Sequence, residues 1–222
     1  MAALEEFLQD TAYFVGLSAA EITAFGKSFF SKDAARGEIV LFEGEPAQVL
    51  CFVVFGVVKV FKTSAEGKEQ ILELVRPGES CNDVPVFGNG KNLSSAEALG
   101  PVVLYGIKKP DLEIISHDYP VVAQNIIRVL STKVERLVAL IEDLSFKNVT
   151  GRVAKILLEH VGDDGSAHRL TQQEMAAMAG TAREMVGRSL KALEENRAIR
   201  LEHHRIVIKN KELLAEIAGV IS

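Results

Sequence analysis

The 222-residue sequence contains no tryptophan, only two cysteines and no long apolar run. Two cysteines cannot build a disulfide framework, and they cannot supply the four thiolates of an iron–sulfur cluster within one chain. No uncharged stretch approaches the roughly 18 apolar residues of a membrane span. The acidic start, Met-Ala-Ala-Leu-Glu-Glu, also lacks the basic region of a signal peptide. We therefore expect a cytoplasmic protein with no membrane partner.

The sequence also lacks the motifs of several large enzyme classes. It contains no P-loop, no Gly-x-Ser-x-Gly and no His-Glu-x-x-His. Its composition, 48% hydrophobic and 25% charged, is that of a folded protein and excludes wholesale disorder. We expect a folded protein that is not an enzyme.

Charge is unevenly distributed along the chain. Residues 147–222 hold 12 Lys/Arg and 10 Asp/Glu, whereas residues 1–146 hold 13 Lys/Arg and 20 Asp/Glu. The last third is therefore mildly basic and the rest is acidic. A net charge of +2 is a weak electrostatic footprint for nucleic acid, so a prediction of DNA binding has to rest on motif geometry.

The first hundred residues change from helical to strand-like texture. The segment up to about Phe30 is expected to be helical, with a capping box at Ser18 and Glu21. From about Gly37, short β-branched and aromatic runs alternate with glycines that recur every eight to twelve residues or so. This spacing predicts an antiparallel sandwich or barrel, with two strands between Val49 and Phe61 joined by a tight turn at Gly56.

A helical period begins after Pro120. Apolar residues there step by three and four positions, which is the a/d pattern of a coiled coil. This pattern favours pairing with a second copy, although a helix lying on its own β domain is the alternative. The predicted dimer seam consists of Ile127, Leu130, Val134, Leu137, Ile141 and Leu144.

The residues from Thr171 onward fit a helix-turn-helix. The position where the two helices cross is small, Ala176, and the turn position that favours a positive φ is glycine, Gly180. The position that packs the second helix on the first is apolar, Val186. Capping boxes are expected at Thr171-x-x-Glu174 and at Thr181-x-x-Glu184. Two strands near Ile199–Glu202 and Ile206–Ile208 would form a small wing.

Three charged residues lie near the start of the second helix of this motif: Arg183, Glu184 and Arg188. Arginine can donate two hydrogen bonds to guanine, and glutamate can accept one from cytosine. The recognition helix of a helix-turn-helix presents such side chains to the bases. The alternatives are that the arginines are ordinary solvated charges and that Glu184 only caps the helix.

The whole sequence resembles the CRP/FNR family of bacterial transcription factors. The resemblance is carried by Leu41-Phe-Glu-Gly-Glu-Pro46, by the hinge stretch Leu144–Leu158 and by Ala182-Arg-Glu-Met-Val-Gly-Arg-Ser-Leu-Lys191. It implies an α+β protein with an effector-binding, jelly-roll-like double-stranded β-helix (residues 1–118). A dimerisation helix (119–146) and a winged helix-turn-helix that binds DNA (147–222) would follow.

The resemblance also implies partners and DNA contacts. The residues matching Arg183, Glu184 and Arg188 in the catabolite activator branch read a TGTGA-type half-site, so we expect a homodimer on palindromic double-stranded DNA. Family members touch RNA polymerase through the loop matching residues 160–167. Expected contacts to the DNA backbone are Gln172, Gln173, Thr181 and, in the wing, His203 and His204.

The effector stretch departs from the pattern of cyclic-AMP-binding relatives. Asn82-Asp83 stands where those relatives have Gly-Glu, and Leu93 or Ser94, followed by Ser95, stands where they have the arginine that holds the phosphate. A buried phosphate without this bidentate cation loses its strongest contact. The hydroxyl residues that meet adenine in those relatives correspond to Leu137 and Val138. The sequence therefore disfavours cyclic AMP.

Several other effectors fit an apolar pocket. Some relatives sense carbon monoxide or nitric oxide through haem, and Cys81 and His117 are the candidate haem ligands here. The alternatives are that Cys81 is a small residue near a loop and His117 a solvated residue. A cyclic nucleotide, an organic metabolite or a redox signal are the other effectors that the sequence leaves open.

Overall fold

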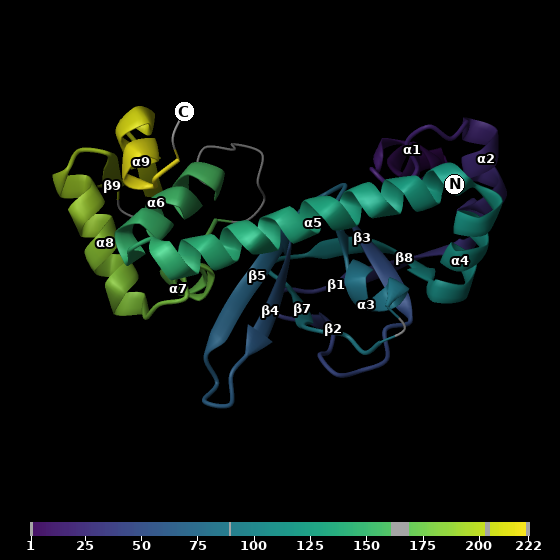
Figure 1. The fold of residues 1–222 in the computed structure, drawn as a ribbon, viewed down its shortest axis with the longest axis horizontal. Helices are drawn as coiled ribbons and strands as arrows, with labels where there is room; N and C mark the ends of the chain where they lie inside the picture. Colours follow the sequence, from purple (N-terminus) through teal and green to yellow (C-terminus); the bar gives the residue numbers. More distant parts are fainter. Residues whose placement is uncertain (1, 89, 161–168, 203–204, 221–222) are drawn as a thin grey trace. The chain divides into compact units, whose positions relative to one another are not determined.

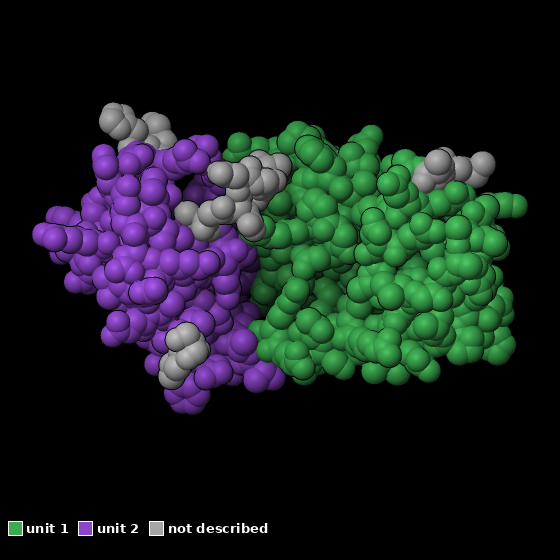
Figure 2. Space-filling model, turned by 90° about the horizontal axis from the view of Figure 1, so that it is seen from above, with its two compact units in different colours: residues 1–62, 72–136 green, residues 63–71, 137–222 purple. Residues whose placement is uncertain are grey.

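The protein is described by a computed structural model, in which residues 2–88, 90–160, 169–202 and 205–220 are placed. The chain divides into two compact units, which Figure 2 shows in different colours. Unit 1 comprises residues 1–62 and 72–136, and unit 2 comprises residues 63–71 and 137–222. Each unit is described by itself.

The strands of the first hundred residues form two antiparallel sheets, as the spacing of the glycines predicts (Figure 1). Buried residues from both sheets, such as Val53, Val58 and Leu104, form one apolar core between them. One sheet has the order β1 (Phe29–Ala34), β8 (Val102–Lys108), β3 (Val49–Phe55), β6 (Ser80–Cys81). The other has the order β2 (Ile39–Leu41), β7 (Ser95–Ala98), β4 (Val58–Thr63), β5 (Glu69–Val75).

The first strand begins earlier than the sequence predicts. Phe29 and Phe30 lie in β1 and pair with Ile107 and Gly106 of β8, whereas we expected helix up to about Phe30. The reason is a long-range contact. The ring of Phe30 lies over Gly106, where an added Cβ would come within 2.4 Å of the ring carbon Cζ. Tertiary packing therefore overrides the local helical pattern.

A second core lies between the N-terminal helices and the sheet that contains β3. The opening segment contains the expected capping box, with the Glu21 carboxylate bonded to the Ser18 amide at 2.7 Å. The helices of this region are α1 (Ala2–Asp10), α2 (Ala19–Phe25), η1 (Gly26–Ser28), α3 (Asp83–Phe87) and α4 (Lys109–Asp118). Buried members of this core include Leu8, Phe14, Ile22, Leu50, Phe52, Ile107, Leu112 and Val122.

The long helix α5 (Pro120–Phe146) follows as predicted (Figure 1). Its first turns are anchored in unit 1, where Val122 and Ile126 are buried. Asn125 is also buried, and its amide donates to the backbone carbonyls of Tyr13 (3.1 Å) and Val15 (2.8 Å). Among the helices of the described residues, none is long and apolar enough to cross a membrane.

Unit 2 contains the predicted helix-turn-helix and hairpin, and it ends with a helix that was not predicted from the sequence, α9 (Lys211–Ile217). The other elements are α6 (Val149–His160), α7 (Gln172–Ala179), α8 (Arg183–Glu195), β9 (Ile199–Glu202) and β10 (Arg205–Ile208). Its core includes Val153, Leu157, Met175, Ala176, Val186, Leu190, Leu193 and Leu214. Strands β9 and β10 pair antiparallel, as expected for the wing. His203 and His204 lie outside the described residues.

Candidate DNA interface and ligand cavity

Helices α7 and α8 form the predicted helix-turn-helix. Thr171 caps α7 and shares a capping box with Glu174, as the sequence predicts. Gly180 ends α7 in the left-handed conformation, with φ of 62°. Ala176 and Val186 are both buried where the helices meet, so the small and the apolar position have the predicted roles.

The capping box predicted at Thr181 and Glu184 is wrong. The N-cap of α8 is Ala182, which makes no side-chain capping bond. The Thr181 amide donates to the Ala176 carbonyl at 3.0 Å, so Thr181 still belongs to the turn that ends α7. Helix α8 therefore starts one residue later than a box at Thr181 requires. Glu184 is an exposed residue of the first turn rather than the partner of a cap.

Arg183, Glu184 and Arg188 are all exposed at the N-terminal end of α8. The helical period places them on one face, around Gly187. A Cβ added at Gly187 would meet no heavy atom within 4 Å, so the surface between the three charged side chains is open. A face of this kind can approach the edges of bases in a major groove.

The proposed backbone contacts lie at the start of the motif. Gln172 and Gln173 are exposed in the first turn of α7, and Thr181 is half-buried in the turn. Sequence reasoning missed Arg152 of α6. Its guanidinium donates to the carbonyls of Ala179 (Nε, 2.7 Å) and Lys147 (Nη1, 2.5 Å). Arg152 thereby ties the end of α7 to the segment before α6, and no local pattern in the sequence signals this.

The stretch 81–83, which is predicted to bind an effector, lies in unit 1. Its acidic residue is bonded to other side chains of the protein. Asp83 is 2% exposed, and its carboxylate accepts hydrogen bonds from Ser80 Oγ (2.6 Å) and from the Tyr13 hydroxyl. It also forms an ion pair with Lys133 Nζ of α5 at 3.0 Å. Burial, together with the negative charge of Asp83, raises the pKa of Tyr13 well above its usual value, so the hydroxyl keeps its proton as a donor. We call Tyr13, Ser80, Asp83 and Lys133 the polar clasp.

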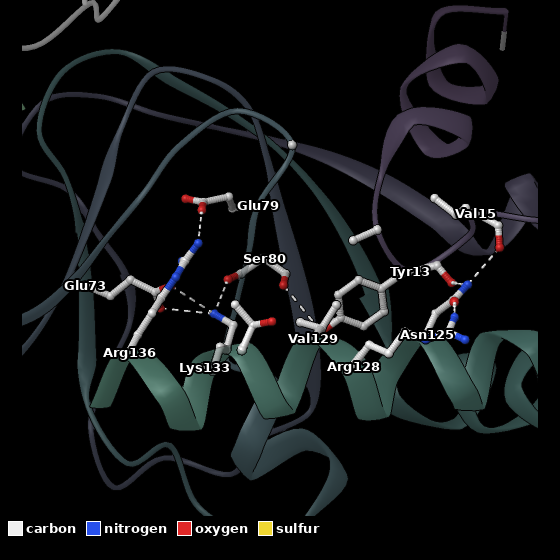
Figure 3. A pocket seen from close by; sticks show the side chains of 13 residues that line it. Tyr13, Val15, Glu73, Glu79, Ser80, Asn125, Arg128, Val129, Lys133 and Arg136 are labelled. Carbon is white, nitrogen blue, oxygen red and sulfur yellow. Dashed lines mark hydrogen bonds and ion pairs between the residues drawn. The ribbon is translucent and has the colours of Figure 1, made fainter. Parts of the chain in front are cut away.

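A cavity of about 380 Å³ lies beside the polar clasp, along α5 (Figure 3). In Figure 3 the side chains of α5 line one side of it, and Glu73, Glu79 and Ser80 face them. Its other walls include the Tyr13 ring and Val15. The full lining is Ala12, Tyr13, Val15, Glu73, Gly78, Glu79, Ser80, Asn125, Arg128, Val129, Thr132, Lys133 and Arg136.

Most charges at this cavity are already paired. Glu73 bonds both Lys133 Nζ and Arg136 Nη1 at 3.0 Å, and Arg136 Nη2 lies 3.1 Å from Glu79 Oε1. Burial lowers the pKa of Lys133, but the carboxylates of Asp83 and Glu73 outweigh it, so the pKa ends up raised and the ammonium stays charged. Arg128 donates to the Asn125 side-chain oxygen at 2.8 Å. A polar ligand in this cavity would have to exchange partners with these groups.

The remaining residues of the predicted effector pocket are not brought together at this cavity. Ser95 lies in β7 and its hydroxyl accepts a hydrogen bond from the Glu43 amide at 3.1 Å, and Ser94 directly precedes β7. Asn82 bonds the Val49 carbonyl at 2.9 Å. Leu137 and Val138 are exposed residues of α5 and are not among the lining residues.

The candidate haem ligands do not fit an iron site in this structure. Cys81 is 1% exposed and pairs across the sheet with Cys51. The hydrogen bond between the thiols and burial raise the pKa of Cys81 well above its usual value, which disfavours the thiolate that iron would need. His117 lies exposed in the last turn of α4. Within the described part of the chain, no cluster of three or more His, Cys, Asp or Glu could hold a metal ion.

The predicted dimer seam is an apolar stripe on the surface of α5. Ile127, Val134 and Ile141 are each more than half exposed, at 64%, 57% and 63%. Leu137 and Leu144 are also exposed, whereas Leu130 packs partly against the N-terminal core. A stripe of this length on a monomer's surface is typical of a protein–protein contact.

Two family profiles match the chain. The profile of the cyclic nucleotide-binding domain matches residues 31–119, and that of the Crp-like helix-turn-helix domain matches residues 151–217. The first covers the two sheets and the second covers α6 through α9. Together they place a sensor-type fold before a DNA-binding fold.

Known proteins share this arrangement over their full length. The CRP-like cAMP-activated global transcriptional regulator of Mycobacterium tuberculosis (strain ATCC 25618 / H37Rv) is 30% identical over 223 residues, which cover 97% of this chain and 100% of that protein. The crystal structure of the Thermus thermophilus catabolite activator protein is 29% identical, covers 96% and 100% of the two chains and has a TM-score of 0.56. FixK2 from Bradyrhizobium japonicum has the same fold, with a TM-score of 0.78 at 22% identity, over 87% of this chain and 99% of its own.

Proposed function

The chain belongs to the CRP/FNR family of DNA-binding transcriptional regulators, and on that premise we propose that it binds a palindromic TGTGA-type site as a homodimer under the control of an effector other than cyclic AMP. The observation that carries the proposal is the exposed face of α8, where Arg183, Glu184 and Arg188 surround the open surface at Gly187. These three side chains match the base-reading residues of the catabolite activator branch.

The chemistry of this face supports reading of G·C pairs. Each arginine can donate two parallel hydrogen bonds to the O6 and N7 atoms of a guanine, and Glu184 can accept from the amino group of a cytosine. Because Glu184 takes no part in capping α8, its carboxylate is available for this role. Two copies of α8 in one dimer would fit successive major grooves, about 34 Å apart.

Substitution of Arg183 by alanine tests base reading. We expect R183A to weaken binding to a TGTGA palindrome by about 1–3 kcal/mol while leaving binding to a scrambled duplex unchanged. Fluorescence anisotropy at fixed salt on both duplexes measures this difference. The matched control is K191A, which removes an exposed cation from the same helix. A phosphate contact at Lys191 would weaken binding to both duplexes alike. Equal losses on the two duplexes for R183A would contradict the proposal.

The dimer and the polymerase contact are proposed on different grounds. The exposed apolar stripe of α5 supports the dimer. Contact with RNA polymerase is supported by family membership alone, because residues 161–168 of the matching loop lie outside the described residues. A bacterial two-hybrid assay with polymerase subunits tests this contact.

Two features of unit 1 support an effector other than cyclic AMP. Leu93, one of the two residues at the position of the phosphate-binding arginine, is 59% exposed and carries no charge. The Asp83 carboxylate, which stands where a ribose contact would be, is already bonded to Ser80, Tyr13 and Lys133. A nucleotide would have to break this buried network, which is costly unless it replaces every bond. The cavity along α5, next to the clasp, is the site we propose for a small polar effector.

Binding measurements test the effector proposal. We expect isothermal titration with cyclic AMP to show no saturable heat and no tightening of DNA binding. The M. tuberculosis regulator, which is named as cAMP-activated, serves as the positive control.

Haem sensing stays a prediction from the sequence. A haemin titration tests it, and saturation near one haem per chain with a band that shifts on adding carbon monoxide would support it. Tight cyclic AMP binding that also tightens DNA binding would overturn the proposed effector class.

A further inference from the structure

The two cysteines of the chain lie opposite each other on neighbouring strands. Cys51 of β3 pairs directly with Cys81 of β6 in antiparallel register. Both side chains are buried, at 6% and 1% exposure, and both belong to the core between the two sheets. Thirty positions separate them in the sequence, so the sequence alone did not suggest that they meet.

Their placement satisfies the geometry of a disulfide. Directly opposed residues of an antiparallel pair point to the same face of the sheet. Their Cα atoms are separated by about 4.5 or 5.5 Å, depending on the type of pair, and both values lie in the range of about 4.4–6.8 Å that a disulfide spans. A bond between the sulfurs would need little movement of the backbone.

Strand β6 is the part of the sheet best suited to move. It contains two residues and lies at the edge of its sheet, next to β3 only. It is followed by Asn82, whose φ of 75° marks a sharp change of backbone direction. Opening of β6 would admit a small oxidant to both sulfurs. It would also separate Ser80 from Asp83, so the oxidation is expected to be slow.

We propose that Cys51 and Cys81 are a reversible dithiol switch, which hydrogen peroxide oxidises to a cross-strand disulfide. In the first step one cysteine, as its thiolate, attacks a peroxide oxygen, and the O–O bond breaks. Its sulfenic acid and hydroxide result, and the hydroxide takes up the proton lost by the thiol. In the second step the sulfur of the other cysteine attacks the sulfenic sulfur, the S–O bond breaks and water leaves. Overall, two thiols and one peroxide give one disulfide and two waters.

The two buried thiols influence each other's ionisation. The hydrogen bond with Cys81 lowers the pKa of Cys51 against the effect of burial, and the positive charge of Lys32 lowers it further, whereas the negative charge of Asp83 raises it. The same disulfide and the same two waters form whichever of the two sulfurs attacks the peroxide first.

The disulfide would act on the long helix through the polar clasp. Cys81 lies between Ser80 and Asp83, two members of the clasp, and Asp83 bonds Lys133 of α5. A covalent tie between β6 and β3 would restrict the movement of β6, and so would bias how Asp83 meets Lys133. Helix α5 carries the proposed dimer seam, so this step rests on the proposed function. Disulfide formation does not, and it can be measured separately.

Counting free thiols tests the disulfide directly. The full-length protein is treated with hydrogen peroxide, quenched with catalase and unfolded in excess N-ethylmaleimide. Intact-mass spectrometry is then expected to show two maleimide groups on the reduced protein, none on the oxidised protein, and two again after dithiothreitol. Oxidised protein that still accepts two maleimides would overturn the proposal. A disulfide-linked dimer on non-reducing electrophoresis would also overturn it, because the bond would then join two chains.

DNA binding tests the coupling to α5. Peroxide is expected to change the Kd for the TGTGA duplex by about fivefold or more, and dithiothreitol is expected to restore it. The matched control is C81A, which keeps the four methionines, including Met185, exposed on α8. A response that persists in C81A would come from oxidation of methionine or of Cys51 alone, not from the disulfide, and would overturn the coupling. An unchanged Kd together with full loss of thiols would also overturn the coupling, while leaving the disulfide in place. Circular dichroism of C81A verifies that the variant is folded.

Discussion

Asp143 is the acidic residue where α5 meets α6. Its carboxylate bonds Lys147 Nζ at 2.9 Å and also bonds Lys155 Nζ of α6. Burial would raise the pKa of Asp143, but the hydrogen bonds and positive charges of Lys155 and Lys147 outweigh burial and leave the pKa lowered. The Asp143 carboxylate thus connects the end of α5 to α6 through ion pairs.

The substitution D143N is expected to destabilise the protein by about 1–2 kcal/mol at pH 7, because it removes the charge that both lysines bond. Since the pKa is lower in the folded state, this stabilisation is present above about pH 4 and is lost as the pH falls through the folded value. Urea unfolding followed by circular dichroism, at several pH values, measures it. The difference between wild type and D143N should shrink below pH 4. Equal stability of the two proteins at pH 7 would contradict this role for Asp143.

Some contacts between residues leave no signal in the local sequence. The sequence gives no sign that Cys51 and Cys81 lie opposite each other, or that the Tyr13 hydroxyl reaches Asp83. These contacts join segments far apart in the chain. Only the folded sheet and the N-terminal segment packed on it bring them together.

At the scale of elements, the turn between α7 and α8 shows how local chemistry sets a boundary. Two Thr-x-x-Glu sequences are present, and only the first forms a capping box. The second fails because the left-handed Gly180 and the bond from the Thr181 amide to the Ala176 carbonyl extend the turn by one residue. Capping patterns thus locate a helix start within about one residue, and the preceding turn decides which residue it is.

Replacement of Gly180 by alanine is expected to destabilise unit 2 by about 1–2 kcal/mol, because an L-residue is strained at positive φ. The added Cβ would also lie 2.8 Å from Leu144 Cδ2. The opposite result is expected for G187A, where a Cβ meets nothing within 4 Å. In that helical position alanine should stabilise by about 0.5–1 kcal/mol. Thermal unfolding of both variants gives the comparison, and a G180A variant as stable as wild type would refute the strain argument.

For the whole molecule, the proposed function requires that the exposed seam of α5 bring two copies of α8 to one palindrome. Ile127, Val134 and Ile141 are exposed and apolar along the helix. A second copy of α5 would bury them in knobs-into-holes packing. Each chain alone carries a single α8, and a palindrome requires two.

A charge in the middle of the seam tests this arrangement. I141D is expected to make the protein monomeric, because an aspartate cannot be buried unpaired between two helices. Sedimentation velocity measures the change, and binding to the TGTGA palindrome should weaken in parallel. The control is E135Q, at an exposed position of α5 outside the apolar stripe, which should leave the dimer intact. If I141D sediments as wild type does, the seam lies elsewhere.

The helix-turn-helix, the long helix and the two-sheet region could be recognised in the sequence alone. These features are recorded in local patterns: the glycine spacing of the sheets, the heptads of α5, and the small, glycine and apolar positions at Ala176, Gly180 and Val186. Such patterns need only the period of one helix or strand to be recognised. Family resemblance added the proposal of which face of α8 meets the bases.

The tertiary structure alone decided how the interior of unit 1 is arranged. The sequence directed attention to Cys81, Asn82 and Asp83 as a ligand site, whereas the fold bonds Asp83 to Tyr13, Ser80 and Lys133 and places a cavity beside them. It also brings Cys51 to Cys81 and Phe30 to Gly106. The physical reason is that burial, ion pairing and strand register are properties of residues distant in sequence. Their partners are fixed only when the chain closes on itself.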